Sequence, residues 1–226
     1  MFIPLYDHNP KKYLARSWVN HSLIVINLIV FGIQYILPTS AEEVVLITMA
    51  VVPGWLSEPL IDQVPFLPDQ TTLVTYAFLH ADWMHVLSNM LFLWVFGDNI
   101  EDAMGHIRYL VFYLACAAAG GLAHMLADPA STAPLVGASG AVAGVIAAYI
   151  ILFPKVRIYV LAKIIVPLPV PIPALWVLGL WIGMQLFFVL FPDGGPTAWW
   201  AHMGGLIAGA TLVFFMKRST VNLFGR

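Results

Sequence analysis

Of the 226 residues, 61% are hydrophobic and only 10% are charged, whereas an ordinary soluble domain has roughly 25% charged residues. This composition excludes a chain that folds around a single core in water, and it favours an integral membrane protein. The formal net charge of −2 argues against nucleic acid as a partner, and the single cysteine, Cys116, excludes an internal disulfide.

Six segments approach the roughly 20 apolar residues that a helix needs to cross the hydrocarbon core of a bilayer. In chain order they are 18–37, 80–96, 109–127, 135–153, 174–191 and 198–216. A shorter run, 44–52, is expected to be an interfacial element inside a long loop. The alternating prolines of 167–173 exclude a helix and predict an extended strap or connection. The sequence therefore predicts an all-α membrane protein, one domain over residues 1–226 with six transmembrane helices.

The basic residues give the orientation of this bundle. With six spans, the N-terminus, the loops after the second and fourth spans and the C-terminus lie on one side, and they contain every lysine and arginine: Lys11, Lys12, Arg16, Arg108, Lys155, Arg157, Lys163, Lys217, Arg218 and Arg226. The opposite loops contain only acidic charges: Glu42, Glu43, Glu58, Asp62, Asp69, Asp82, Asp128 and Asp193. Because short loops rich in lysine and arginine stay in the cytoplasm, both termini are predicted to be cytoplasmic.

Strongly polar side chains inside spans are costly and invite a functional interpretation. The second span contains His80, His85 and Asn89, the fourth contains Ser139 and the sixth contains His202. These three spans begin on the same face, and Ser139 and His202 each lie four residues, or about 6 Å, past the predicted start of their span. The two residues are therefore expected at matching depth in the same leaflet.

Small residues predict that the fourth and sixth spans also pack closely. His202, Gly205 and Gly209 share one face of the sixth span, and Ser139, Ala143 and Ala147 share one face of the fourth. Packing these two stripes together would bring the Ser139 hydroxyl towards the His202 imidazole.

A serine hydroxyl is a weak nucleophile unless a base removes its proton, and histidine is suited to this at neutral pH. Neither the fourth nor the sixth span contains a carboxylate, so the sequence favours a Ser139–His202 dyad over a triad. The side chains of His85 and Asn89, with backbone N–H groups near Ser139, could supply donors to an oxyanion.

Other interpretations of these residues stay open. Ser139 in its Gly/Ala context could be a packing residue, and Ala141 stands where a G-x-S-x-G elbow needs glycine. A metal site on His80, His85 and His202 would lack carboxylates to complete it. A small transporter would show related halves and a polar path through both leaflets, and the sequence has neither.

The polar residues belong to four ordered motifs. They are His80-Ala-Asp-Trp-Met-His85-Val-Leu-Ser-Asn89, Gly97-Asp-Asn-Ile-Glu101 with Gly105 and Arg108, Gly137-Ala-Ser139-Gly140, and Ala198-Trp-Trp-Ala-His202-Met-Gly-Gly205. Over a core of residues 71–216 the sequence resembles the rhomboid intramembrane serine proteases. The resemblance implies that Ser139 is the nucleophile and His202 the base, and that Glu101 and Arg108 are structural. His85, Asn89 and the Ser139 amide would form the oxyanion hole, with Gly137 next to it.

The resemblance further implies cleavage of single-span membrane proteins at or near the outer end of their transmembrane segment, with no metal, nucleotide or other cofactor. The expected location is the plasma (inner) membrane of a prokaryote, with the active site opening to the outer side. A catalytically inactive rhomboid-like scaffold or chaperone is the alternative within the family. Two positions depart from its pattern, because residues 38–79 contain no arginine and Ala143 replaces the aromatic residue that many members have four positions after the serine.

Overall fold

The computed structural model describes residues 3–57, 69–163, 167–191 and 197–225. Helices dominate this part of the chain. They are α1 (Trp18–Ile36), α2 (Thr39–Met49), α3 (Pro53–Ser57), α4 (Thr72–Thr75), α5 (Trp83–Phe92), α6 (Asp98–Met104), α7 (His106–Ala127), α8 (Ser139–Leu152), α9 (Ala174–Leu190) and α10 (Trp199–Met216). Short 3₁₀ turns occupy Asp69–Thr71, Tyr76–Phe78 and Leu223–Gly225. The strands are β1 (Ile3–Asp7), β2 (Arg157–Lys163) and β3 (Pro167–Pro173).

Three of the described helices, α1, α7 and α10, are long and apolar enough to cross a membrane. The apolar helices α8 and α9 are shorter, with 14 and 17 residues. The predicted second span, 80–96, contains α5 and most of a π-helical segment, η3 (Leu93–Gly97), and α6 follows directly after it. The backbone keeps helical dihedral angles at both junctions, so one helix with a π-helical middle runs from Trp83 to Met104. The chain is an integral membrane protein with a mostly helical fold.

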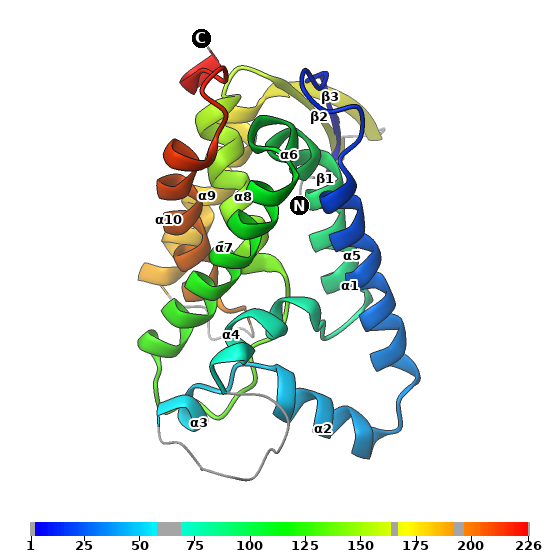
Figure 1. The fold of residues 1–226 in the computed structure, drawn as a ribbon, viewed down its shortest axis with the longest axis vertical. Helices are drawn as coiled ribbons and strands as arrows, with labels where there is room; N and C mark the ends of the chain where they lie inside the picture. The colour runs from blue at the N-terminus through cyan, green and yellow to red at the C-terminus, as the bar shows by residue number, and fades with distance from the viewer. Residues whose placement is uncertain (1–2, 58–68, 164–166, 192–196, 226) are drawn as a thin grey trace.

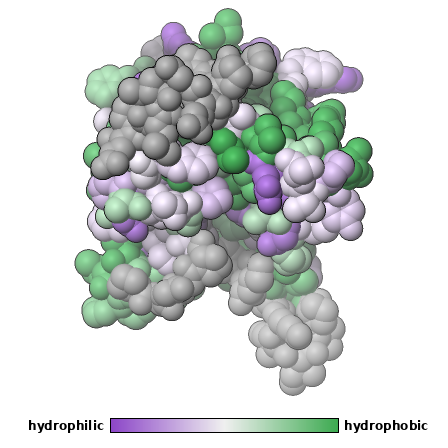
Figure 2. All heavy atoms as spheres, turned by 90° about the horizontal axis from the view of Figure 1, so that it is seen from below, coloured by the Kyte–Doolittle hydropathy of each residue, from purple (hydrophilic) through white to green (hydrophobic). Residues whose placement is uncertain are grey.

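The long helices run side by side along the length of the molecule, and the C-terminus lies at one end of it, whereas the N-terminus lies further in within the same half (Figure 1). The sheet lies at this same end, whereas α2 and α3 lie at the opposite end. Of the charged residues used to predict orientation, Glu58, Asp62, Asp193 and Arg226 lie outside the described residues. Viewed from the α2 end, the middle of the face carries hydrophilic side chains among hydrophobic ones (Figure 2).

The core of the bundle is formed where α7, α8 and α10 meet at their glycines. A Cβ atom added to Gly205 would overlap the Gly140 carbonyl oxygen, and one added to Gly209 would overlap the Gly144 carbonyl oxygen. The predicted small-residue stripe of α10 is therefore at the contact. The predicted stripe of α8 also faces α10, because Ala143 and Ala147 pack against Leu206, while the closest backbone approach is made by Gly140 and Gly144.

The prediction of an all-α protein is wrong in one respect, because β1, β2 and β3 form an antiparallel sheet in the order β1-β2-β3. The predicted proline-rich strap is the edge strand of this sheet. Alternate residues of a strand point their N–H groups to the same side, so Pro167, Pro169, Pro171 and Pro173 share one side of β3. If the proline nitrogens face the open edge of the sheet, the N–H groups that proline lacks are not needed for the hydrogen bonds between β3 and β2.

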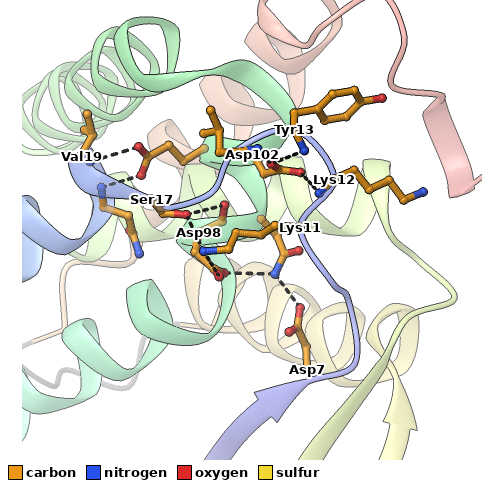
Figure 3. Close-up of polar contacts among 12 residues, drawn as sticks. Asp7, Lys11, Lys12, Tyr13, Ser17, Val19, Asp98 and Asp102 are labelled. Carbon is orange, nitrogen blue, oxygen red and sulfur yellow. Dashed lines mark hydrogen bonds and ion pairs between the residues drawn. The ribbon is translucent and has the colours of Figure 1, made fainter.

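The segment before α1 is bound to the α6 region by carboxylates (Figure 3). Asp102 accepts hydrogen bonds from the backbone N–H groups of Lys12, Tyr13 and Leu14 at 2.6–2.8 Å. Glu101 accepts from the N–H groups of Val19 and Asn20 at 3.0 and 2.7 Å. Glu101 thus satisfies donors in the first turn of α1, which would otherwise lack partners.

A second polar group lies beside these bonds. The Asn99 amide donates to Asp7 Oδ2 at 2.9 Å and to Asp98 Oδ1 at 3.1 Å, so two carboxylates share one amide (Figure 3). The Tyr149 hydroxyl of α8 also donates to Asp7. Burial, and then the nearby charge of Asp98, raise the pKa of Asp7 to about 6 against the hydrogen bond from Tyr149. Burial also raises the pKa of Asp98.

Candidate functional site

Ser139 is the first residue of α8, because the chain before it cannot be helical. Leu135 exchanges backbone hydrogen bonds with Val51 in an isolated β-bridge, at 2.8 and 3.2 Å. Gly137 then has a φ of 117°, a left-handed conformation that favours glycine. The predicted start of the fourth span at residue 135 is therefore four residues too early. Ser139 lies at the helix N-terminus, where backbone N–H groups lack partners within the helix.

His202 lies in the first turn of α10 with its side chain buried between two hydrogen-bonding groups. Its Nε2 atom is 2.9 Å from Ser139 Oγ, and its Nδ1 atom is 2.7 Å from Gln185 Oε1. Within the described residues, neither hydrogen-bond partner of the ring is a carboxylate. The structure thus brings together the two residues that the sequence paired, and it adds Gln185.

Two tryptophans flank the His202 ring. Trp181 of α9 has its ring centroid 6.0 Å away at an interplanar angle of 34°, and Trp199 of α10 has its centroid 5.9 Å away in an edge-on arrangement. Ala143 carries no ring, so aromatic packing around this histidine comes from α9 and α10 and not from α8.

Asn89 and His85 lie on α5. Asn89 is 6% exposed, and in the described part of the chain its Nδ2 donor has no hydrogen-bond partner. A buried donor without a partner is uncommon in folded proteins, and one explanation is that it bonds to a ligand or to a charge that forms during a reaction. His85 is half-buried, and its backbone N–H donates to Asp82, the N-cap of α5, at 2.8 Å.

Gly137 fixes how α8 approaches His85. A Cβ atom at this position would lie 2.5 Å from the His85 Nε2 and Cε1 atoms, so only glycine lets the ring rest against the backbone. The Gly137 N–H donates to the Tyr76 carbonyl oxygen at 3.0 Å. Gly137 therefore stands beside the candidate oxyanion donors, and its own amide is not a free donor.

His80 is buried, and its ring lies 5.1 Å from that of His85, centroid to centroid. The ring of His202 is already hydrogen-bonded to Ser139 and Gln185. In the part of the chain that the structure describes, no three His, Cys, Asp or Glu side chains group as metal ligands would.

Gln185 was missed by the sequence reasoning, although a signal was present. It is the only amide on α9, and the remaining side chains of this helix are uncharged. The rule that polar groups inside spans deserve a functional interpretation would have selected it.

Comparison with known proteins places the chain in one family. A family model described as the Rhomboid domain matches residues 68–219. The chain is 26% identical to Rhomboid protein 1, mitochondrial, of Saccharomyces cerevisiae, over 95% of this chain and 59% of that protein. It is 34% identical to RHOMBOID-like protein 12, mitochondrial, of Arabidopsis thaliana, over 62% of this chain and 44% of that protein. It is 28% identical to Rhomboid-like protease 3 of Toxoplasma gondii, over 67% of this chain and 53% of that protein. The matches thus cover less than two thirds of the length of each of these relatives.

Proposed function

The chain belongs to the rhomboid family, and from this premise we propose that it is an intramembrane serine endopeptidase with Ser139 as nucleophile and His202 as general base. The observation that carries the proposal is the 2.9 Å separation between Ser139 Oγ and His202 Nε2. This distance is within hydrogen-bond reach, as transfer of the serine proton to the ring requires.

In the proposed reaction, Ser139 Oγ attacks the carbonyl carbon of a substrate peptide bond while His202 Nε2 accepts the hydroxyl proton. The carbonyl oxygen becomes an oxyanion, which the side-chain donors of Asn89 and His85 and the Ser139 amide stabilise. The protonated His202 then gives its proton to the leaving amine. Water, activated by the same ring, hydrolyses the acyl-enzyme and restores Ser139. No step uses a metal, nucleotide or other cofactor.

The Nδ2 donor of Asn89, which has no partner among the residues that the structure describes, supports this role. A donor that is buried without a partner in the resting protein gains its hydrogen bond only when charge develops on the substrate. Interactions that form only in the transition state raise the rate of the chemical step.

The proposed substrates are single-span transmembrane proteins cut at or near the outer end of their span. We place the site in a six-span bundle whose N- and C-termini are cytoplasmic, because all ten basic residues fall on that side in the predicted topology. In a prokaryotic plasma membrane the site would open to the outer side. Two of the relatives named above are mitochondrial by name, so an equivalent organelle membrane is the other candidate location.

A fluorophosphonate that reacts with activated serines tests the proposal. The purified protein in detergent micelles should be labelled at Ser139, and neither Ser139→Ala nor His202→Ala should be labelled. Thr211→Val is a matched control, since Thr211 is an exposed hydroxyl on α10 that donates to its own helix. This variant should label like the wild type. A wild-type protein that is folded but unlabelled, and that cuts no single-span substrate, would favour the inactive scaffold.

A further inference from the structure

Gln185 is a buried amide on a helix that is otherwise apolar. It lies near the C-terminal end of α9 and is 2% exposed. Other side chains of α9, such as Leu180 and Phe187, are 64% and 54% exposed at the surface of the bundle. A polar group within such a helix is costly unless it has a partner, and the partners of Gln185 include the candidate base.

The hydrogen bonds of Gln185 define which way its amide points. Its Nε2 atom donates to the Trp181 carbonyl oxygen, one turn earlier on α9, at 3.1 Å. Its Oε1 atom lies 2.7 Å from His202 Nδ1. Because the NH₂ group is bonded to a carbonyl, the oxygen faces the ring, and an amide oxygen can only accept.

This orientation selects one tautomer of His202. The ring nitrogen facing Gln185 Oε1 must carry the proton, so in the neutral ring Nε2 is left as an acceptor. Nε2 is the atom that faces Ser139 Oγ at 2.9 Å. In the other neutral tautomer, two acceptors, Gln185 Oε1 and His202 Nδ1, would face each other, and Nε2 would present an N–H group to Ser139.

We propose that Gln185 is a positioning residue for His202, which holds the ring in the tautomer and orientation that deprotonate Ser139. The inference rests on the proposed function. Gln185 lies on α9, whereas Ser139 lies on α8 and His202 on α10. The ability of His202 to act as a base therefore depends on how α9 packs against α8 and α10. Trp181 and Trp199 flank the same ring and restrict its rotation, in the place of an aromatic side chain at Ala143.

Kinetics of two substitutions test this role. Gln185→Met keeps the size of the side chain and replaces the amide oxygen with a thioether, which is only a weak acceptor. It should lower kcat for a single-span substrate about tenfold, equal to about 1.4 kcal/mol in the barrier, with KM within about twofold of wild type. Asn27→Leu is the matched control, because Asn27 is a buried amide of another span that donates to the Leu23 carbonyl oxygen of its own helix. It should leave kcat unchanged.

Gln185→Glu separates positioning from packing. The carboxylate keeps an acceptor oxygen next to Nδ1 and adds negative charge, which favours the protonated ring. Turnover should be restored above that of Gln185→Met, and the acid limb of the pH profile of kcat/KM should move to higher pH. A purely structural amide predicts neither effect. The inference is overturned if Gln185→Met has wild-type kcat, or if the Met and Glu variants lose activity equally with unshifted profiles.

A spectroscopic readout separates this inference from the proposed function. In ¹⁵N-histidine-labelled Ser139→Ala protein, which cannot turn over, His202 should show a protonated Nδ1, and Gln185→Met should abolish or shift this signal. If the signal behaves so but the wild type is unlabelled by fluorophosphonate, the protease proposal fails while the geometry stands. If the wild type is labelled but the signal is unchanged in Gln185→Met, the role of Gln185 is refuted alone.

Discussion

Asn89 allows activity and stability to be separated by one substitution. Its Nδ2 donor is buried and has no partner among the described residues. Leaving a buried donor unpaired costs about 1 to 3 kcal/mol, and leucine has nearly the same shape as asparagine. Asn89→Leu should therefore raise the free energy of unfolding, by about 1 kcal/mol. The same substitution removes a proposed oxyanion donor, which should lower kcat by about 10² to 10³.

A paired amide provides the control for this prediction. Asn20 Nδ2 donates to the Leu93 carbonyl oxygen at 2.9 Å, and Asn20 Oδ1 accepts from the Tyr109 hydroxyl at 2.8 Å. Asn20→Leu leaves the Leu93 carbonyl oxygen and the Tyr109 hydroxyl without this partner, so it should lower the free energy of unfolding by about 1 to 3 kcal/mol. Unfolding would be followed by denaturant titration in micelles, and kcat by cleavage of a single-span substrate. Wild-type turnover in Asn89→Leu, or a loss of stability equal to that of Asn20→Leu, would refute the reasoning.

The remaining predictions concern the dyad, the N-terminal polar group and the topology. The double variant Ser139→Ala/His202→Ala should be no less active than either single variant, because residues acting as one unit do not lose activity additively; additive losses would argue against a dyad. Since the folded-state pKa of Asp7 is about 6, above its ordinary 3.8, ionised Asp7 opposes folding at pH 7. The free energy of unfolding, measured against Asp7→Asn, should rise as pH falls through 6 and level off below about 4; a fall over this range would contradict the assignment. In cells that express the protein without Cys116, a cysteine introduced at Thr132 should react with an impermeant thiol reagent added outside the cells, and a cysteine introduced at Arg157 should not. The reverse labelling pattern would show that the predicted topology is inverted.

Much of the site could be anticipated because polar residues are rare in membrane spans. Depth along a helix follows from counting residues at 1.5 Å each, and small residues mark where helices approach. These two rules paired Ser139 with His202, and the structure brings them within 2.9 Å. Their catalytic roles, and those of His85 and Asn89, remain predictions.

The errors come from interactions between residues far apart in sequence. Residue 135 looks like the start of an apolar helix, but its backbone pairs with Val51 in another loop. The proline repeat at 167–173 excludes a helix locally and pairs with the neighbouring strand 157–163, but the third strand of the sheet, 3–7, comes from the opposite end of the chain. Apolar periodicity within a segment carries no information about such partners.

Gln185 illustrates the limit of reasoning from depth alone. Residues 174–190 start at the end of the bundle where 139–152 and 199–216 finish (Figure 1), so a residue near the C-terminal end of α9 lies level with residues near the N-terminal ends of α8 and α10. Counting from each end would have placed Gln185 beside Ser139 and His202 in depth. Which face of α9 meets the ring, however, depends on packing: the helix is apolar all around, so no amphipathic stripe orients it. The buried amide itself then becomes the orienting feature, since the observed rotation of α9 pairs Gln185 Oε1 with His202 Nδ1.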